Sequence, residues 1–348
     1  MKAMADVTAL VIALGMMAMT TGHAQITIPT VTVGDAGNPN DTTGYGGVSY
    51  IYNIAVTEVN LIQYTAFLNA VAATDLYSLY NAGMGTDSNS AGITRNGSSG
   101  SYTYAVKGSG ARPVTYVSWF DAARFANWMA NGQPTGAQQN STTENGAYSL
   151  LGAISGVEFA KNAINPNTGT MTTWWIPNEN EWYKAAYYDP SASGPSDDYW
   201  LYPTQSDSAP GNTIGAGANQ ANFKDTDYSV TQSENYSSSQ NYLTDGGAYS
   251  SSGSYYGTFD QGGNVWERTD AVTGSSGYVR GGSWSSNTET LQSFYRSGSG
   301  STDELNFLGF RVAGANEASI AVPEPSTAML MLMAGAGGLV WRRRKATL

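Results

Sequence analysis

The chain of 348 residues contains no cysteine and only one histidine, His23. That histidine stands at the end of an N-terminal segment with the layout of a cleaved export signal, so we expect the exported protein to contain neither residue type. Their absence excludes a cysteine nucleophile, a Ser-His-Asp triad, a haem ligand and a zinc site of the usual kind. Hydroxyl, carboxylate, amide and aromatic groups remain, and these suit oxygen-ligated Ca²⁺ or polar binding.

Charge is also scarce and mostly of one sign. Charged residues make up 12% of the chain, and the formal net charge is -11. Without residues 1–24 and 322–348, the chain has 11 basic and 25 acidic residues, a balance of about -14. Such a surface repels nucleic acid and attracts divalent cations, so we expect no nucleic-acid partner. The 41 glycines and 23 tyrosines indicate a loop-rich extracellular domain rather than a helical cytosolic enzyme.

The first 24 residues have the three parts of a secretory signal peptide. Lys2 precedes an apolar run over residues 7–19, and small residues lead to Ala24. This order predicts cleavage after Ala24. Residues 25–44 then form a short N-terminal segment ahead of the main domain.

The C-terminal residues 322–348 also have three parts. The motif VPEPS (322–326) is followed by an apolar run over 328–341 and by the basic cluster RRRK (342–345). The apolar run is shorter than the roughly 20 residues of a comfortable membrane span, and the basic cluster favours the cytoplasmic side. The tail resembles a PEP-CTERM sorting signal, which exosortases of Gram-negative bacteria recognise and process.

The resemblance implies export to the cell surface or extracellular matrix of a Gram-negative bacterium. Exosortase and the secretion machinery are the implied partners, with transient membrane attachment through the C-terminal span before sorting. A plain C-terminal anchor is the alternative, and it also places residues 25–322 outside the cytoplasm.

Three helices are expected, each with a capping pair at its start. The pairs are Asn60 with Gln63, Ser118 with Asp121, and Asn178 with Glu181. Each follows a short extended segment, at 50–57, 113–117 and 174–177. Residues 187–257 show little periodicity, and their tyrosines argue against simple disorder because aromatic side chains provide surface to pack.

Six motifs follow one another between residues 45 and 315. They are VNLIQY (59–64), RPVTYVSW (112–119), IPNENEWY (176–183), GGNVWE (262–267), VRGGSW (279–284) and LGFRV (308–312). In this order they resemble the formylglycine-generating enzyme (sulfatase-modifying factor) family. The resemblance implies an α+β fold over residues 45–315, with a C-type-lectin-like core, many loops and little regular secondary structure.

Catalytic members of that family carry two cysteines after the Gly-Gly-Ser motif, and these bind copper and oxidise a substrate cysteine. The corresponding positions here are Ser286 and Leu291. Neither can bind Cu(I), which prefers thiolates. The iron-dependent relatives need a histidine cluster, which is also missing. We therefore expect no copper, no iron and no formylglycine generation, and a non-catalytic protein.

The resemblance also implies structural Ca²⁺. The family's ligand positions around the GGNVWE motif fall on Asp260, the Gly263 carbonyl, the Val265 carbonyl and Glu267. Oxygen ligands of this kind fit a hard cation. A second site implicates Asn222 and the Phe223 carbonyl, with partners in the 237–241 stretch. The alternative for Glu267 is a pairing with an arginine.

A ligand-facing rim is expected where relatives have their active site. Trp284 and Tyr295 flank this segment, and Ser285 and Asn287 add small polar groups that suit a glycan. The alternative for any one tryptophan is a place in the core. Arg280, Arg296 and Arg311 are expected to anchor loops through salt bridges.

The leading hypothesis is an exported, non-catalytic protein of the cell surface or exopolysaccharide matrix, acting as a structural or ligand-binding module with glycan as the ligand class. Two alternatives remain open. One is a residual enzyme that acts on an extracellular substrate through carboxylates. The other is a hypervariable ligand-binding receptor of C-type-lectin fold.

Overall fold

The computed structural model describes residues 25–157, 159–191, 198–273 and 276–316. The expected signal peptide (1–24) and sorting tail (322–348) lie outside the described residues. Within the described ranges, no helix combines the length and apolar character needed to cross a membrane.

The three main helices begin where the capping pairs predict. They are α1 (Leu61–Val71), α3 (Trp119–Ala130) and α4 (Glu179–Tyr187). Each has a complete capping box, in which the cap side chain accepts from the third helical N–H and the third side chain accepts from the cap N–H. Shorter helical turns are α2 (Gly83–Thr86), the π-helix η1 (Asn140–Glu144) and the 3₁₀-helix η2 (Thr288–Leu291).

The expected extended segment 113–117 is interrupted before α3. Tyr116 has a φ of 61°, in the left-handed region. Its N–H donates to the Leu305 carbonyl at 3.0 Å, and its hydroxyl donates to the Asp87 carboxylate. Contacts with two distant segments therefore override the local preference for extended backbone, which corrects the prediction.

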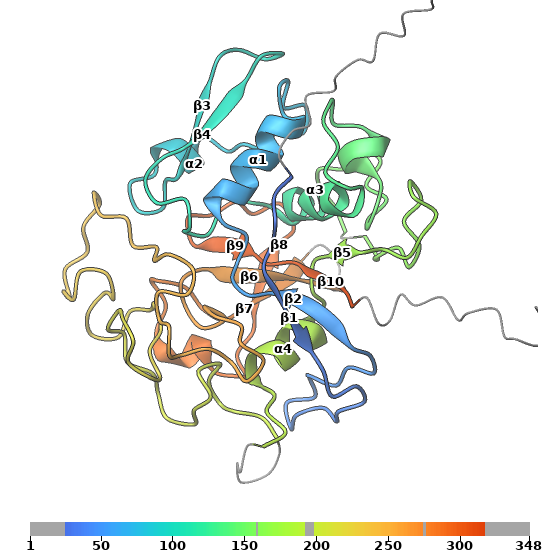
Figure 1. Cartoon of the computed structure of the whole chain (residues 1–348). Coiled ribbons are helices and arrows are strands. Elements are labelled where there is room, and N and C mark those ends of the chain that lie inside the picture. The colour runs from blue at the N-terminus through green and yellow to red at the C-terminus, as the bar shows by residue number, and fades with distance from the viewer. Residues whose placement is uncertain (1–24, 158, 192–197, 274–275, 317–348) are drawn as a thin grey trace, which may run out of the picture.

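Within the described ranges, strands form two four-stranded sheets and a hairpin (Figure 1). The first sheet has the antiparallel order β1 (Thr30–Val33), β2 (Tyr52–Ala55), β10 (Ala313–Ala315), β5 (Trp174–Trp175). The second has the order β8 (Ser297–Gly300), β7 (Ser276–Arg280), β6 (Trp266–Thr273), β9 (Leu308–Phe310), with β6 and β9 parallel. The hairpin pairs β3 (Ile93–Asn96) with β4 (Thr103–Val106).

An aromatic core lies between α1, α3 and β9. Phe125 of α3 packs edge-on against Phe67 of α1 and Phe310 of β9, with ring centroids 5.4 and 5.5 Å apart. Trp128 and Tyr64 complete the group, and all five side chains are buried. Edge-to-face packing of this kind adds to the free energy gained from burial.

Residues 188–265 contain no helix and no strand longer than an isolated bridge among their described positions. Buried tyrosines hold the segment together, in one group around Tyr183, Tyr188 and Tyr199 and another around Tyr228 and Tyr242. The α+β, loop-rich fold is thereby confirmed.

Candidate functional site

Ser286 and Leu291, the two positions that the resemblance assigns to redox cysteines, have different surroundings in this chain. Ser286 is half-buried in a cluster of hydroxyls, with its Oγ 3.0 Å from Ser283 Oγ and accepting from the Ser283 N–H at 3.1 Å. Leu291 is completely buried in an apolar cluster that includes Tyr202 and Phe223. A hydroxyl cluster and a core side chain therefore stand where the redox pair would be.

The backbone around Leu291 is tightly packed. Gly282 has a φ of 74°, and a Cβ at that position would lie 2.8 Å from Leu291 Cδ1. The Leu291 carbonyl accepts from the Tyr187 hydroxyl at 3.1 Å. The glycine of the motif thus serves close packing as well as a left-handed turn.

Glu267 is held by an arginine, the alternative that the sequence left open. Arg311 donates from Nε to Oε2 and from Nη2 to Oε1, at 2.5 and 2.6 Å. Trp182 Nε1 donates to Oε2 at 2.8 Å, and Glu267 and Arg311 are both completely inaccessible. Both carboxylate oxygens therefore already have charged or polar partners.

Further carboxylates share this buried region. Asp260 has a φ of 60° and accepts from the Gly247 N–H at 2.6 Å. Burial raises the pKa of Asp260 to about 6. Glu58 accepts from Asn264 Nδ2 at 3.1 Å, but its Oε2 is buried without a hydrogen-bond partner. Burial first, and then the charges of Asp260 and Glu267, raise the pKa of Glu58 well above its usual value.

The buried carboxyl groups of Glu58 and Glu267 and the half-buried one of Asp260 interact with one guanidinium, that of Arg311. This excess of negative charge and the unpartnered Glu58 oxygen fit a hard cation or a proton. Within the described ranges, no three acidic or histidine side chains converge on one metal position. A cation would therefore depend on carbonyl oxygens, such as those of Gly263 and Val265, beside Asp260.

Glu58 did not emerge from the sequence as a site residue. It precedes the VNLIQY motif by one position, far from Asp260 along the chain. A lone glutamate before an apolar residue gives no local signal, and only the tertiary fold brings it to Asn264.

The proposed second calcium position is partly committed to internal bonds. Asn222 is buried, and its Nδ2 donates to the Tyr242 carbonyl at 2.9 Å and to Asn264 Oδ1 at 3.0 Å. The Phe223 carbonyl is 3.4 Å from Asn212 Nδ2, and the Phe223 ring is buried. The residues 237–241 are held by the Asn89 amide, which donates to two of their carbonyls.

The expected rim divides into an inner and an outer part. Trp284 is buried and stacks on Tyr242, with ring centroids 4.8 Å apart and planes 5° apart. Ser285 and Asn287 are exposed. Tyr295 is half-buried, and its ring centroid lies 6.0 Å from that of Trp266. Trp284 therefore supports the rim from the core, and the outward-facing groups are the serine, the amide and the tyrosine.

The three arginines anchor loops, as expected. Besides the Arg311 pair, Arg280 and Arg296 both bind Glu179, at 2.7 and 2.8 Å. Arg280 also donates to the carbonyls of Ser293 and Tyr295, at 2.8 and 3.0 Å. The rim is thus fixed to the start of α4 by a buried guanidinium.

Two family models match the chain. A sulfatase-modifying factor enzyme 1-like domain covers residues 8–316, and a PEP-CTERM protein-sorting motif covers residues 321–345. No curated protein matches significantly.

Several solved structures are similar. CarF is 20% identical, with a TM-score of 0.49 and coverage of 83% of this chain and 99% of that chain. Variable protein 1 of Treponema denticola is 15% identical, with a TM-score of 0.41 and coverage of 85% of this chain and 98% of that chain. PvdO from Pseudomonas aeruginosa is 14% identical, with a TM-score of 0.42 and coverage of 83% of this chain and 92% of that chain.

Proposed function

Because the chain belongs to the sulfatase-modifying factor family and carries a PEP-CTERM motif, we propose that it is an exported, non-catalytic protein. We place it at the cell surface or in the exopolysaccharide matrix, where it would act as a structural or ligand-binding module. The motif implies processing by an exosortase. The burial of Leu291 in an apolar cluster is the observation that carries the non-catalytic part of the proposal.

A redox function would need thiolates at both family positions. The chain has no cysteine at all, and Leu291 leaves no open position for a metal or a substrate thiol beside Tyr202 and Phe223. The chain has the family's domain but lacks the redox pair, and this combination supports a binding or structural role.

Two measurements test this proposal. Incubation of the purified protein with copper and a cysteine-containing sulfatase peptide should give no oxygen consumption and no formylglycine by mass spectrometry. A catalytically active family member serves as the positive control. Fractionation of cells and matrix, followed by immunoblotting, should find the protein at the surface or in the matrix. Detection of formylglycine, or a purely cytoplasmic location, would refute the proposal.

We further propose that the outer rim binds a glycan. Ser285, Asn287 and Tyr295 provide a hydroxyl, an exposed amide and an aromatic side chain on a backbone held by Arg280. Asn287→Ala should weaken binding of the intact protein to purified matrix polysaccharide without changing its melting temperature. Equal polysaccharide binding by Asn287→Ala and the wild type would count against the rim as the binding site.

A structural Ca²⁺ near Asp260 is also proposed. The clustering of half-buried Asp260 with buried Glu58 and Glu267 supports it, while the Arg311 pair already neutralises part of their charge. Removal of Ca²⁺ with EGTA should lower the melting temperature, and added Ca²⁺ should restore it. An unchanged melt would instead indicate that a proton on Glu58 relieves the charge.

A further inference from the structure

A polar hollow lies on the helical part of the molecule, away from the family's redox positions in sequence. Its volume is about 690 Å³, within the range of roughly 300–1,000 Å³ that is usual for small-molecule sites. Four chain segments border it, with side chains from Tyr77, Gln139, Asn140, Ser141, Leu151 and Asn167. Three of the six are carboxamides, and none of the six is charged.

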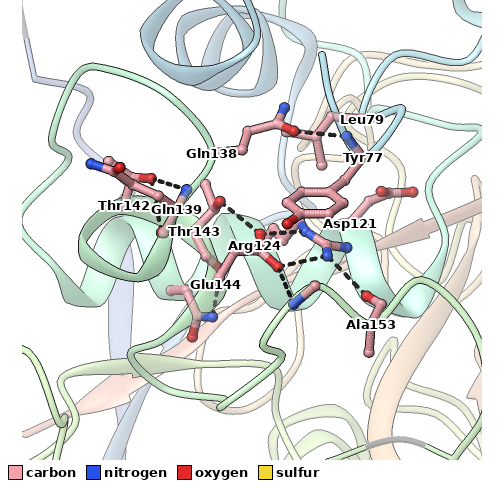
Figure 2. A network of polar contacts seen from close by, with 12 residues as sticks. Tyr77, Leu79, Asp121, Arg124, Gln138, Gln139, Thr142, Thr143, Glu144 and Ala153 are labelled. Carbon is pink, nitrogen blue, oxygen red and sulfur yellow. Dashed lines mark hydrogen bonds and ion pairs between the residues drawn. The ribbon is translucent and has the colours of Figure 1, made fainter. Parts of the chain in front are cut away.

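The hollow has a rigid and electrically neutral base (Figure 2). Glu144 borders it and forms a bidentate pair with buried Arg124, from Nε at 2.7 Å and Nη2 at 2.8 Å. The Gly152 N–H and the Thr143 hydroxyl also donate to Glu144, at 3.0 and 2.9 Å. The carboxylate is thus saturated.

Most of the amides around the hollow are bonded within the protein. Asn167 Nδ2 donates to the Asn140 and Asn145 carbonyls, at 2.7 and 2.9 Å, and Gln139 Nε2 donates to Ser141 Oγ at 3.1 Å. Among the described residues, the exposed Asn140 carboxamide is therefore the main polar group that faces the hollow without an internal bond.

Strained backbone positions the aromatic wall. Tyr77 lies with its ring 4.2 Å from Arg124 Cζ, and its N–H donates to Gln138 Oε1 at 2.8 Å. Asp75 and Ser78, on either side of it, have φ values of 56° and 57°. Left-handed non-glycine residues carry a conformational cost and concentrate at functional sites. The π-helix that supplies Asn140 and Ser141 is another feature common at such sites.

A second, smaller pocket adjoins Tyr77. It has a volume of about 170 Å³ and is bordered by Arg124, Asp121 and Glu304. Arg124 Nη1 is buried and has no hydrogen-bond partner. One guanidinium and two carboxyl groups thus border the same pocket, which favours a neutral ligand, because an anion would meet the carboxyls and a cation the guanidinium.

We propose that the hollow beside Tyr77 binds a neutral oligosaccharide, at a site separate from the 285–295 rim. The Asn140 carboxamide can both donate to and accept from sugar hydroxyls, and Asn167 Oδ1 adds an acceptor. The tyrosine ring and exposed Leu151 provide apolar contact for sugar C–H faces. The net negative charge of the chain disfavours uronic-acid chains. The proposal takes its ligand class from the proposed function and assigns it a second place on the molecule.

Two variants with little effect on folding test the hollow. Asn140→Ala removes an exposed amide that borders the hollow. Ser141→Trp fills the hollow from an exposed position. Asn235→Ala, an exposed amide in the 188–265 segment, is the matched control. Melting curves of all three should overlay that of the wild type.

The intact protein is screened on an array of neutral and uronic-acid oligosaccharides, and the best neutral binder is titrated calorimetrically. We expect two binding events in the wild type. Ser141→Trp should abolish one, Asn140→Ala should weaken the same one by about tenfold, and Asn235→Ala should change neither.

The outcomes separate this inference from the rim proposal. If Ser141→Trp retains every event while Asn287→Ala loses one, the hollow is refuted and the proposed function stands. If Ser141→Trp loses binding and Asn287→Ala does not, the hollow stands and the rim is refuted. A wild type that binds only uronic-acid chains, only proteins, or nothing refutes the hollow.

Discussion

Two regions of this protein are stabilised in different ways. The packed region, residues 52–187, contains α1 and α3 against the aromatic core, and α4 with an aromatic cluster of its own. The loop region, residues 188–265, has no regular element in its described part and is held by buried tyrosine clusters and by side-chain amides that bond to backbone. Asn264, which directly follows the glycine pair of the GGNVWE motif, contacts Asn222, Thr244 and Glu58 through its carboxamide.

The two regions differ in how far apart in the sequence the residues that determine their structure lie. In the packed region the starts of α1, α3 and α4 are each encoded within four residues, by the cap and its partner. In the loop region one amide satisfies groups from several distant segments, so the order depends on tertiary contacts. We expect the packed region to be most sensitive to lost volume and the loop region to lost hydrogen bonds.

The largest effect is expected from Phe125→Ala. The ring is completely buried between Phe67 and Phe310, so its removal leaves a cavity and should lower the free energy of unfolding by about 3–5 kcal/mol. Urea denaturation measures the change. Ile62→Ala, on the exposed side of α1, is the control and should stay within about 0.5 kcal/mol. Similar losses for both would contradict a packed core here.

Asn264→Ala tests the loop region. It removes the acceptor of Asn222 Nδ2 and of the Thr244 N–H, at 3.0 and 3.1 Å, and the donor to Glu58. Buried groups left without partners should lower the free energy of unfolding by about 2–3 kcal/mol. Asn235→Ala, an exposed amide of the same region, should have little effect. A small loss for Asn264→Ala would show that burial alone stabilises the loops.

The pH dependence compares buried acids with their unfolded state. Burial raises the pKa of Asp121 to about 7. The folded protein therefore binds this proton more tightly than the unfolded chain, whose aspartates titrate near pH 4. The stability that the bound proton contributes is lost as pH rises through about 7. Between pH 5 and 7 the loss should be about 2 kcal/mol, with a lower melting temperature at pH 8 than at pH 5.

Asp121→Asn should flatten this slope while keeping an acceptor for the Ser118 N–H and hydroxyl. Asp270, whose pKa burial also raises to about 7, contributes with the same sign and leaves a residual slope. Equal slopes in Asp121→Asn and the wild type would rule out Asp121 as the source.

The smallest effect is expected at a helix cap. Ser118 Oγ accepts from the Asp121 N–H at 3.1 Å, and Ser118→Ala removes that bond from α3. The free energy of unfolding should fall by about 1 kcal/mol, measured by urea denaturation. Ser118→Thr keeps the acceptor and should retain most of the stability. Equal losses in the two variants would point to packing rather than capping.

Much of the fold could be predicted from the sequence. The three capping boxes and the α+β, loop-rich architecture are confirmed, because the former are local and the latter follows from six ordered motifs. The arginine anchors are also confirmed. The left-handed Tyr116 was not predictable, because residues 87 and 305 determine it.

The site was less predictable. The sequence placed Trp284 on a rim, whereas stacking on Tyr242 buries it. Glu58 and the hollow beside Tyr77 depend on residues distant in the chain, which no spacing rule connects. The calcium ligands stay a prediction, and the Arg311 pair shows how a guanidinium from a later motif can take the oxygens that a motif assigns to a metal.

The place of β10 has a consequence for when the protein can fold. This last strand, residues 313–315, lies between β2 and β5 in the interior of the first sheet (Figure 1). The sheet cannot close until almost the whole domain has been synthesised. A chain that still lacks residues 313–315 therefore has no strand to join β2 to β5, and the first sheet is completed late in synthesis.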